Sequence, residues 1–221
     1  PLGVLKWAMS LDGRTALPNG ASQWITGPPA RAWVHQLRSR VDAVIVGGGT
    51  VRADDPLLTS RGLRDPEPLR VVLSRSLDLP SEARLWDVSA ARTLIAHGPE
   101  EPDGLLPHGP ESLSLKVCEP AALMEVLAQR GCNAVLWECG PELAAAAIRQ
   151  GCVQDVVSVV APTLMGGVAA RTPLADLGFT AMDQVDRASF ELPQKLGDDW
   201  LLRMRINAVA ADKFQPEKVI E

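Results

Sequence analysis

Glycines at two predicted strand ends are the residues whose type and spacing point most directly to chemistry. The β-branched run of residues 43–46 ends in three glycines at positions 47–49, and Thr50 follows them. Glycines at the carboxyl end of a buried strand let the backbone approach a ligand closely, and free backbone N–H groups there suit phosphate. In open α/β sheets this edge is where ligands bind. The pattern therefore predicts a phosphorylated ligand at this strand end.

A second junction of the same kind follows the apolar run of residues 134–137. Glu138 stands at the end of this predicted strand, and Gly140 and Pro141 precede an alanine-rich helix. Proline suits the first helical position, and the dipole at a helix N-terminus stabilises an anion by about 0.3 to 1 kcal/mol. We expect Glu138 to point into the same crevice as the first glycine cluster.

Charged residues near the first junction are further candidates. Arg61 and Arg64 lie in a loop near the glycine edge, where they could clamp a phosphate, although loop arginines are usually just solvated. Asp54 and Asp55 precede Pro56 and are predicted to lie on a short turn beside the same edge. Such aspartates also serve as turn formers, so both interpretations stay open.

The end of the third predicted strand bears on the choice of cofactor. Residues 69–73 are followed by Ser74 and Arg75. A Rossmann protein that binds NAD usually has an acidic residue after its second strand, whereas a hydroxyl and an arginine fit a 2′-phosphate. If a dinucleotide binds here, NADPH is therefore favoured over NADH.

The elements that must position these residues alternate between strand and helix up to about residue 160. We expect helices from Pro28, at residues 119–130 and from Pro141, and strands at residues 4–9, 43–46, 69–73, 93–96, 134–137 and 156–160. A surface loop is predicted at residues 97–110, two late strands at 184–192 and 200–206, and a polar tail at 211–221. This order indicates an α/β protein with a mostly parallel sheet and an antiparallel C-terminal edge.

Composition limits the classes of function. A chain of 221 residues with 46% hydrophobic content can bury one sizeable core, so we expect a single domain over residues 1–221. The net charge of −5 argues against a nucleic-acid or anionic-membrane partner. The sequence contains neither an apolar run of membrane-spanning length nor a signal-peptide pattern, and we expect a cytoplasmic protein. The four cysteines have no zinc spacing, so reduced thiols and no metal site are predicted.

Spaced motifs along the chain carry a family resemblance. They comprise Lys6, Ala8, residues 10–13 and 22–26, Gly48, Thr50, Val51, Asp54, Pro56, Leu58, Thr59, Glu138, Gly140, Pro141, Leu143, Ala161, Pro162, Leu164 and Gly166. In this order they resemble the reductase domain of the bifunctional riboflavin-pathway protein RibD, up to about Arg205. The resemblance implies a dihydrofolate-reductase-like three-layer α/β/α fold, usually as a homodimer. It also implies NADPH-dependent reduction of 5-amino-6-(5-phosphoribosylamino)uracil to 5-amino-6-(5-phosphoribitylamino)uracil.

The resemblance also implies roles for particular residues. Lys6, Asp54 and Glu138 would line the reacting end of the substrate, as a proton-handling set whose opposite charges keep one another ionised. The implied substrate-binding residues are Ser22, Arg38, Leu58, Arg61 and Glu138. The implied cofactor-binding residues are Ala8, Trp24, Thr50, Asp54 and the helix start at Gly140, Pro141, Glu142, Leu143 and Ala144. Ser74 and Arg75 occupy the turn that would contact the adenosine phosphate, where the family often has a serine after an aspartate.

Several of these residues have competing interpretations. Lys6 could be an edge-strand lysine that prevents aggregation, Trp24 could be a core aromatic, and Leu58 could be ordinary packing. Arg38 could be confused with a solvated helix face, because Arg40 follows it closely. Cys139 departs from the family, which often has a glycine there, and it adds an oxidisable thiol at the pocket.

Other functions remain to be weighed. A reductase of the same fold could act on a related pyrimidine or pterin, including the diamino-pyrimidinone ribosylamine phosphate. A non-catalytic interaction copy would be expected to lose Lys6, Asp54 or Glu138, and all three are present. The zinc deaminase domain of the bifunctional protein needs a His-x-Glu and a Pro-Cys-x-x-Cys, which this chain does not contain. A deaminase fused upstream and a stand-alone reductase therefore both stay open.

Overall fold

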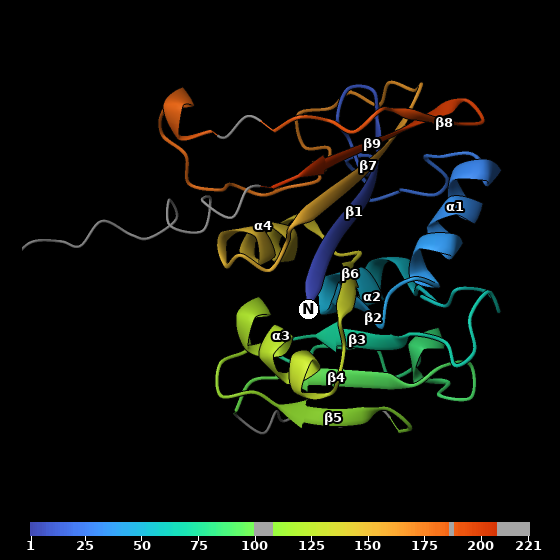
Figure 1. Ribbon diagram of the computed structural model, residues 1–221, viewed down its shortest axis with the longest axis vertical. Coiled ribbons are helices and arrows are strands. Elements are labelled where there is room, and N and C mark those ends of the chain that lie inside the picture. Colours follow the sequence, from blue (N-terminus) through green and yellow to red (C-terminus); the bar gives the residue numbers. More distant parts are fainter. Residues whose placement is uncertain (100–107, 186–187, 207–221) are drawn as a thin grey trace, which may run out of the picture.

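One mixed sheet organises the computed structural model, which describes residues 1–99, 108–185 and 188–206 (Figure 1). Within this part of the chain nine strands lie in the order β5-β4-β3-β2-β6-β1-β7-β9-β8. Their bounds are β1 Leu2–Ser10, β2 Ala43–Gly47, β3 Leu69–Leu73, β4 Thr93–His97, β5 Glu111–Ser114, β6 Ala134–Trp137, β7 Asp155–Ala161, β8 Gln194–Leu196 and β9 Asp199–Arg205. Neighbours from β5 to β7 are parallel, and β9 and β8 add antiparallel pairs. The predicted mostly parallel sheet with an antiparallel C-terminal edge is confirmed.

Helices cover both faces of this sheet. Figure 1 shows α3 (Pro120–Gln129) and α4 (Pro141–Arg149) on one side of the central strands, and α1 (Pro28–Arg38) and α2 (Gly48–Asp54) on the other. Alternate residues of a strand point to opposite faces. Accordingly, Ala43 and Ile45 pack in the core cluster of α3 and α4, whereas Val44 and Val46 pack in the cluster of α1 and α2. The three-layer α/β/α arrangement is thereby confirmed.

The predicted elements differ from the structure mainly near the sheet edges. The strand predicted at residues 184–192 is wrong: a 3₁₀ helix, Met182–Gln184, lies at its start, and the edge strand is β8. β8 is short and exposed, and its register is set by the turn at Gly197, with φ of 69°, rather than by a hydrophobic pattern. The outer strand β5 was likewise not predicted, because its residues are mostly exposed. The predicted tail at residues 211–221 and most of the predicted loop at 97–110 lie outside the described residues.

Contacts from the C-terminal hairpin fix the start of α1. The carboxylate of Asp199 in β9 accepts a hydrogen bond from the backbone N–H of Gly27, at 2.7 Å, directly before the helix begins at Pro28. A side chain at Gly197 would place its Cβ 3.0 Å from Pro29, so this turn packs against the first helical residues. The helix that faces β1 is therefore held at its N-terminus by the opposite end of the chain.

Cysteines and other metal-ligand types are dispersed in the structure. All four cysteines are free thiols. In the described ranges no group of three or more His, Cys, Asp or Glu side chains could hold a metal ion. In the same ranges, none of the helices combines the length and the apolar character needed to cross a bilayer.

Candidate active site

Two adjoining cavities open where β2 and β6 end, beside the middle of β1. The larger cavity has a volume of about 660 Å³, and the smaller cavity has a volume of about 430 Å³. Their shared wall consists of Lys6, Ala8, Thr15, Ser22, Thr50, Asp54 and Glu138. The three residues of the predicted proton-handling set, which come from β1, α2 and the end of β6, thus meet in one cleft.

A buried ion cluster of Lys6, Arg38 and Glu138 lies at that wall, where Lys6 and Glu138 line both cavities and Arg38 lines the smaller one. Arg38 Nε lies 2.6 Å from Glu138 Oε1, Arg38 Nη2 lies 3.1 Å from Oε2, and Lys6 Nζ lies 3.9 Å from Oε2. Their side chains are only 11 to 14% exposed. Burial alone would raise the pKa of Glu138, but the charges of Arg38 and Lys6 outweigh it and hold that pKa at about 2. Burial lowers the pKa of Lys6, Glu138 opposes this effect, and Arg38 reinforces it.

The fold explains why these side chains meet. β1 lies between β6 and β7 in the sheet, so the interpretation of Lys6 as an edge-strand lysine is wrong. Glu138 is the first residue after β6, and its backbone N–H donates to the carbonyl of Ile45 in the neighbouring strand. Arg38 is the last residue of α1, which brings its guanidinium above the sheet at this point.

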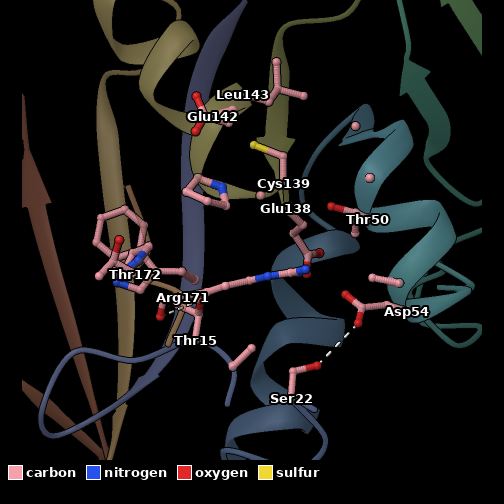
Figure 2. Close-up of a pocket in the computed structure, with 18 of the residues that line it drawn as sticks. Thr15, Ser22, Thr50, Asp54, Glu138, Cys139, Glu142, Leu143, Arg171 and Thr172 are labelled. Atoms are coloured by element: carbon pink, nitrogen blue, oxygen red, sulfur yellow. Dashed lines mark hydrogen bonds between the residues drawn. The ribbon is translucent and has the colours of Figure 1, made fainter. Parts of the chain in front are cut away.

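Asp54 faces the cleft from the end of a helix. It is the last residue of α2, so the predicted short turn begins only at Asp55, which adopts a left-handed conformation with φ of 39°. Figure 2 shows Asp54 and Ser22 facing each other, with the Ser22 hydroxyl donating to Asp54 Oδ1 at 3.3 Å. Asp54 lines both cavities, and Asp55 instead accepts a hydrogen bond from the backbone N–H of Arg84.

The glycine cluster has two different functions in the structure. Gly47 and Gly49 line the larger cavity, as predicted for a close backbone approach. Gly48 is buried, and a Cβ there would lie 3.0 Å from the Ser74 hydroxyl. Ser74 is therefore packed under α2, and the Nε of Arg75 donates to the carbonyl of Cys118. Neither Ser74 nor Arg75 is among the lining residues of the two cavities.

The start of α4 forms the opposite wall of the larger cavity. Gly140, Pro141, Glu142 and Leu143 line it, whereas Ala144 is only 1% exposed and packs in the core behind them. Cys139 also lines this cavity, and Figure 2 shows it between Glu138 and Leu143. Burial raises the pKa of the Cys139 thiol to about 12, so the thiol stays protonated and is a poor nucleophile.

Three residues of the smaller cavity bear on alternatives left open by the sequence. Trp24 is 71% exposed, with the Arg31 guanidinium 4.6 Å above its ring, so the interpretation as a core aromatic is wrong. Leu58 is 3% exposed and packs in the core cluster of α1 and α2, yet it also lines the cavity. Arg61 lines the same cavity, is exposed, and makes no ion pair within the described part of the chain.

Several lining residues were missed in the sequence. In the larger cavity these are Thr15, Arg52, Arg171 and Thr172, and in the smaller cavity Arg31, His35 and Arg84. Helical spacing could have found Arg31 and His35, because both fall on the face of α1 that carries Arg38. Nothing in the local sequence marks Arg171, which follows β7 in a loop and reaches the cavity through backbone pairing with Ala16.

The fold and the cleft together define a class of protein. The three-layer sheet with an antiparallel C-terminal edge, and a ligand-sized cleft at the strand ends, make this an α/β protein of the dihydrofolate-reductase-like type. Residues 1–202 match the family model described as the RibD C-terminal domain, and the chain belongs to this family.

Named relatives agree with this assignment. The riboflavin biosynthesis protein RibD of Synechocystis is 50% identical over 205 residues, which cover 91% of this chain and 56% of the relative. The structure of Acinetobacter baumannii RibD matches with a TM-score of 0.78 and 32% identity, over 94% of this chain and 58% of that one. A deaminase and 5-amino-6-(5-phosphoribosylamino)uracil reductase from Thermotoga maritima matches with a TM-score of 0.80 and 26% identity, over 93% and 56%. The chain thus spans a little over half the length of these relatives.

Proposed function

We propose that this chain carries out the NADPH-dependent reduction of 5-amino-6-(5-phosphoribosylamino)uracil to 5-amino-6-(5-phosphoribitylamino)uracil in riboflavin biosynthesis. The observation that carries the proposal is the convergence of Lys6, Asp54 and Glu138 on the wall shared by two adjoining cavities. A reductase needs such a wall, because hydride donor and acceptor must meet at a shared boundary. The names of the relatives supply the pathway and the substrate.

The larger cavity has the size and the groups expected of a dinucleotide site. Its volume of about 660 Å³ lies within the usual range for ligand pockets. The start of α4 supplies a helix N-terminus, Arg171 supplies a cation, and Arg52 supplies a second cation, whose ion pair with Asp78 is largely exposed. Thr50 and Ala8 would contact the nicotinamide end, near the shared wall. We therefore assign the phosphates of NADPH to Arg52, Arg171 and α4 rather than to Ser74 and Arg75.

The smaller cavity suits a phosphorylated sugar. Its lining includes Arg31, Arg61 and Arg84, together with the Ser22 hydroxyl. Arg31 lies over Trp24, and Arg84 forms an ion pair with Asp55, so both charges already have partners. Arg61 is exposed and has no ion pair among the described residues, and it is our candidate for the substrate phosphate.

The charges in the shared wall fit the reduction of a ribosylamine. Before C1′ can accept hydride, the bond between C1′ and the ring oxygen must break: the oxygen takes a proton, and the nitrogen lone pair forms an iminium with C1′. Bound NADPH supplies the hydride. Glu138, with a pKa of about 2, stays ionised at neutral pH and stabilises positive charge on the imine. Lys6 has a lowered pKa and lies beside Glu138, so it is placed to give this proton to the ring oxygen and to be protonated again from solvent.

A direct absorbance assay of NADPH oxidation tests this function. Purified protein is mixed with NADPH and 5-amino-6-(5-phosphoribosylamino)uracil, and the loss of reduced-nicotinamide absorbance is followed. Parallel reactions contain NADH, or the diamino-pyrimidinone ribosylamine phosphate in place of the uracil. We expect oxidation of NADPH with the uracil and stoichiometric formation of the ribityl product.

Two results would count against the proposal. Rapid turnover of the diamino-pyrimidinone, with none of the uracil, would assign the chain to reduction before deamination. If the protein binds NADPH but turns over neither compound, the substrate is a different one. Asp155→Asn serves as a control for folding, because this carboxylate is buried but does not line either cavity.

The resemblance also implies a homodimer, which we include in the proposal. Large apolar side chains are exposed near the C-terminal edge of the sheet, among them Leu164, Val168, Phe190, Leu192 and Trp200. A second copy covering this edge would bury them. Light scattering of the purified protein tests the stoichiometry, and charged substitutions at Phe190 and Leu192 should then yield a monomer.

A further inference from the structure

Two segments of the family motif, residues 10–13 and 161–166, lie in loops that contact each other. The first loop follows β1 and the second follows β7, and these two strands are parallel neighbours in the sheet. The loops therefore leave the sheet at the same edge. Both also reach the larger cavity, which residues 15–16 of the first loop and residues 171–173 of the second help to line.

Asp12 joins the two loops through its carboxylate. Oδ1 accepts hydrogen bonds from the Ser10 hydroxyl at 2.5 Å and from the backbone N–H of Met165 at 3.0 Å, and Oδ2 accepts one from the backbone N–H of Gly166 at 2.7 Å. The side chain is exposed, and these bonds, the one from Ser10 above all, lower the pKa of Asp12 to about 2. The carboxylate is thus ionised at neutral pH, which strengthens the hydrogen bonds that it accepts.

The same loops are joined a second time at the cavity wall. The backbone N–H of Thr15 donates to the carbonyl of Arg171 at 2.8 Å, and Ala16 forms an antiparallel bridge with Arg171. Figure 2 shows Thr15 beside Arg171 and Thr172. The contact between the loops therefore has Asp12 at one end and Arg171 at the other.

The side chain of Arg171 makes no contact that would fix its place. It is exposed, and in the part of the chain that the structure describes it forms neither an ion pair nor a hydrogen bond. Its position is therefore set by its backbone, which the first loop holds.

We propose that Asp12 is a positioning residue for the cofactor, which joins the loops after β1 and β7 and so holds Arg171 at the larger cavity. This inference rests on the proposed function, because it deepens the assignment of that cavity to NADPH. Asp12 itself lines neither cavity. Without its carboxylate the second loop would have to be ordered when the cofactor binds, and that ordering lowers affinity.

Removal of the carboxylate should weaken NADPH binding and spare the chemical step. We expect Asp12→Ala to raise the Kd for NADPH about tenfold, with kcat at saturating NADPH changed less than about twofold. The reason is that Lys6, Asp54 and Glu138 are carried by β1, α2 and the end of β6 rather than by the second loop. Fluorescence titration and steady-state kinetics measure the two quantities. A lower kcat with an unchanged Kd would overturn the proposal.

Asp87→Ala is the matched control. Asp87 is also exposed, accepts hydrogen bonds from the Ser89 hydroxyl at 2.5 Å and from the Ser89 backbone N–H at 3.0 Å, and lines neither cavity. Its removal should leave the Kd for NADPH unchanged. An equal rise of the Kd in both variants would show a general loss of order and refute a specific role of Asp12. Thermal unfolding confirms that folded protein is being compared.

A double-mutant cycle tests whether Asp12 acts through Arg171. If it does, Asp12→Ala should raise the Kd for NADPH far less in an Arg171→Ala background than in the unsubstituted protein. Multiplied effects in the double variant would show that Asp12 acts by another route, and the proposal would then be wrong.

Amide hydrogen exchange followed by NMR tests the same contact without any ligand. In Asp12→Ala we expect faster exchange of the Met165 and Gly166 amides, which lose their acceptor, and of the Thr15 amide, which reports on the hydrogen bond to Arg171. Unchanged exchange at Thr15 would overturn the inference. If the unsubstituted protein failed to bind NADPH, the proposed function would be wrong, and the exchange rates would still decide whether Asp12 holds Arg171.

Discussion

Glu138 and Asp155 are both buried carboxylates with two cationic neighbours, but they lie at different ends of the sheet. Asp155, the first residue of β7, is 1% exposed and pairs with Arg203 at 2.7 Å and Arg205 at 3.1 Å. Those arginines are 41% and 71% exposed, and both come from the neighbouring strand β9. The cations around Glu138 are 14% exposed, come from two different elements, and border a cleft.

This difference separates a structural ion cluster from a functional one. At Asp155 the arginines extend into solvent, so the charges are screened, and the cluster ties β7 to β9. At Glu138 the same chemistry is enclosed beside a cavity, where charges act strongly on one another and on a ligand. Pairing of charges is common to both sites. Enclosure next to an empty volume is specific to Glu138.

Removal of each carboxylate should give the largest contrast. We expect Glu138→Gln to lower kcat by about 10² to 10⁴, because the charge that stabilises the imine is lost. Asp155→Asn should leave kcat unchanged and reduce the free energy of unfolding by about 1 to 3 kcal/mol. Steady-state kinetics and urea unfolding of both variants check this. Equal losses of activity would erase the distinction between the two sites.

The free energy of unfolding should fall in acid as Glu138 becomes protonated. Glu138 has its pKa lowered from 4.5 to about 2, so its stabilising effect is complete above pH 4.5 and is lost as the pH falls towards 2. The unsubstituted protein should lose roughly 3 kcal/mol over this range from Glu138 alone. Urea unfolding at several pH values measures the slope, which should be shallower in Glu138→Gln. An unaltered slope would mean that Glu138 is not held ionised by its neighbours.

Arg61 extends the comparison to a charge that has no internal partner. Arg61→Ala should raise the KM for the phosphorylated substrate by about 10- to 100-fold, which corresponds to the loss of a hydrogen bond to a charged group. Arg203→Ala, at the Asp155 cluster, is the matched removal of an arginine and should leave this KM unchanged. Normal saturation of Arg61→Ala would identify Arg61 as an ordinary surface residue.

Arg52 offers the smallest and most specific test. Arg52 lines the larger cavity and pairs with Asp78 at 3.2 Å, whereas Arg75 contacts the carbonyl of Cys118 away from the lining. Arg52→Ala should weaken NADPH binding by about tenfold, as expected for one partly exposed phosphate contact. Arg75→Ala should have little effect. Fluorescence titration with NADPH distinguishes them, and the reverse order would restore the assignment made from the sequence.

The sequence predicted the parts of the fold that depend on repeating patterns. Buried strands such as β2 and β7 are β-branched runs, and α1 and α4 begin at prolines that follow glycine. Such patterns are local, so they can be recognised without tertiary contacts. The edge strands β5 and β8 carry no such pattern. Each pairs with only one other strand and is mostly exposed to solvent, so few of its residues need to be apolar.

The site was predictable where a motif placed a residue at a strand end. Glu138 was expected in the crevice because it follows an apolar strand, and its side chain lies there. Long-range packing decided the rest. Ser74 packs beneath Gly48, away from the larger cavity, whereas Arg52 lines it. Arg171 also lines this cavity, and its loop pairs with Ala16. These contacts join segments far apart in the chain, so spacing alone could not show them.

The hydrogen bond from Gly27 to Asp199 has a practical consequence for protein engineering. Every residue that we assign to the two cavities precedes the C-terminal hairpin, so a shortened version ending before Asp199 would retain them all. It would nevertheless lose the hydrogen bond between Gly27 and Asp199 that holds the start of α1, the helix that carries Arg38. Truncation or fusion should therefore leave this hairpin intact, because it holds the start of α1 although none of its residues lines either cavity.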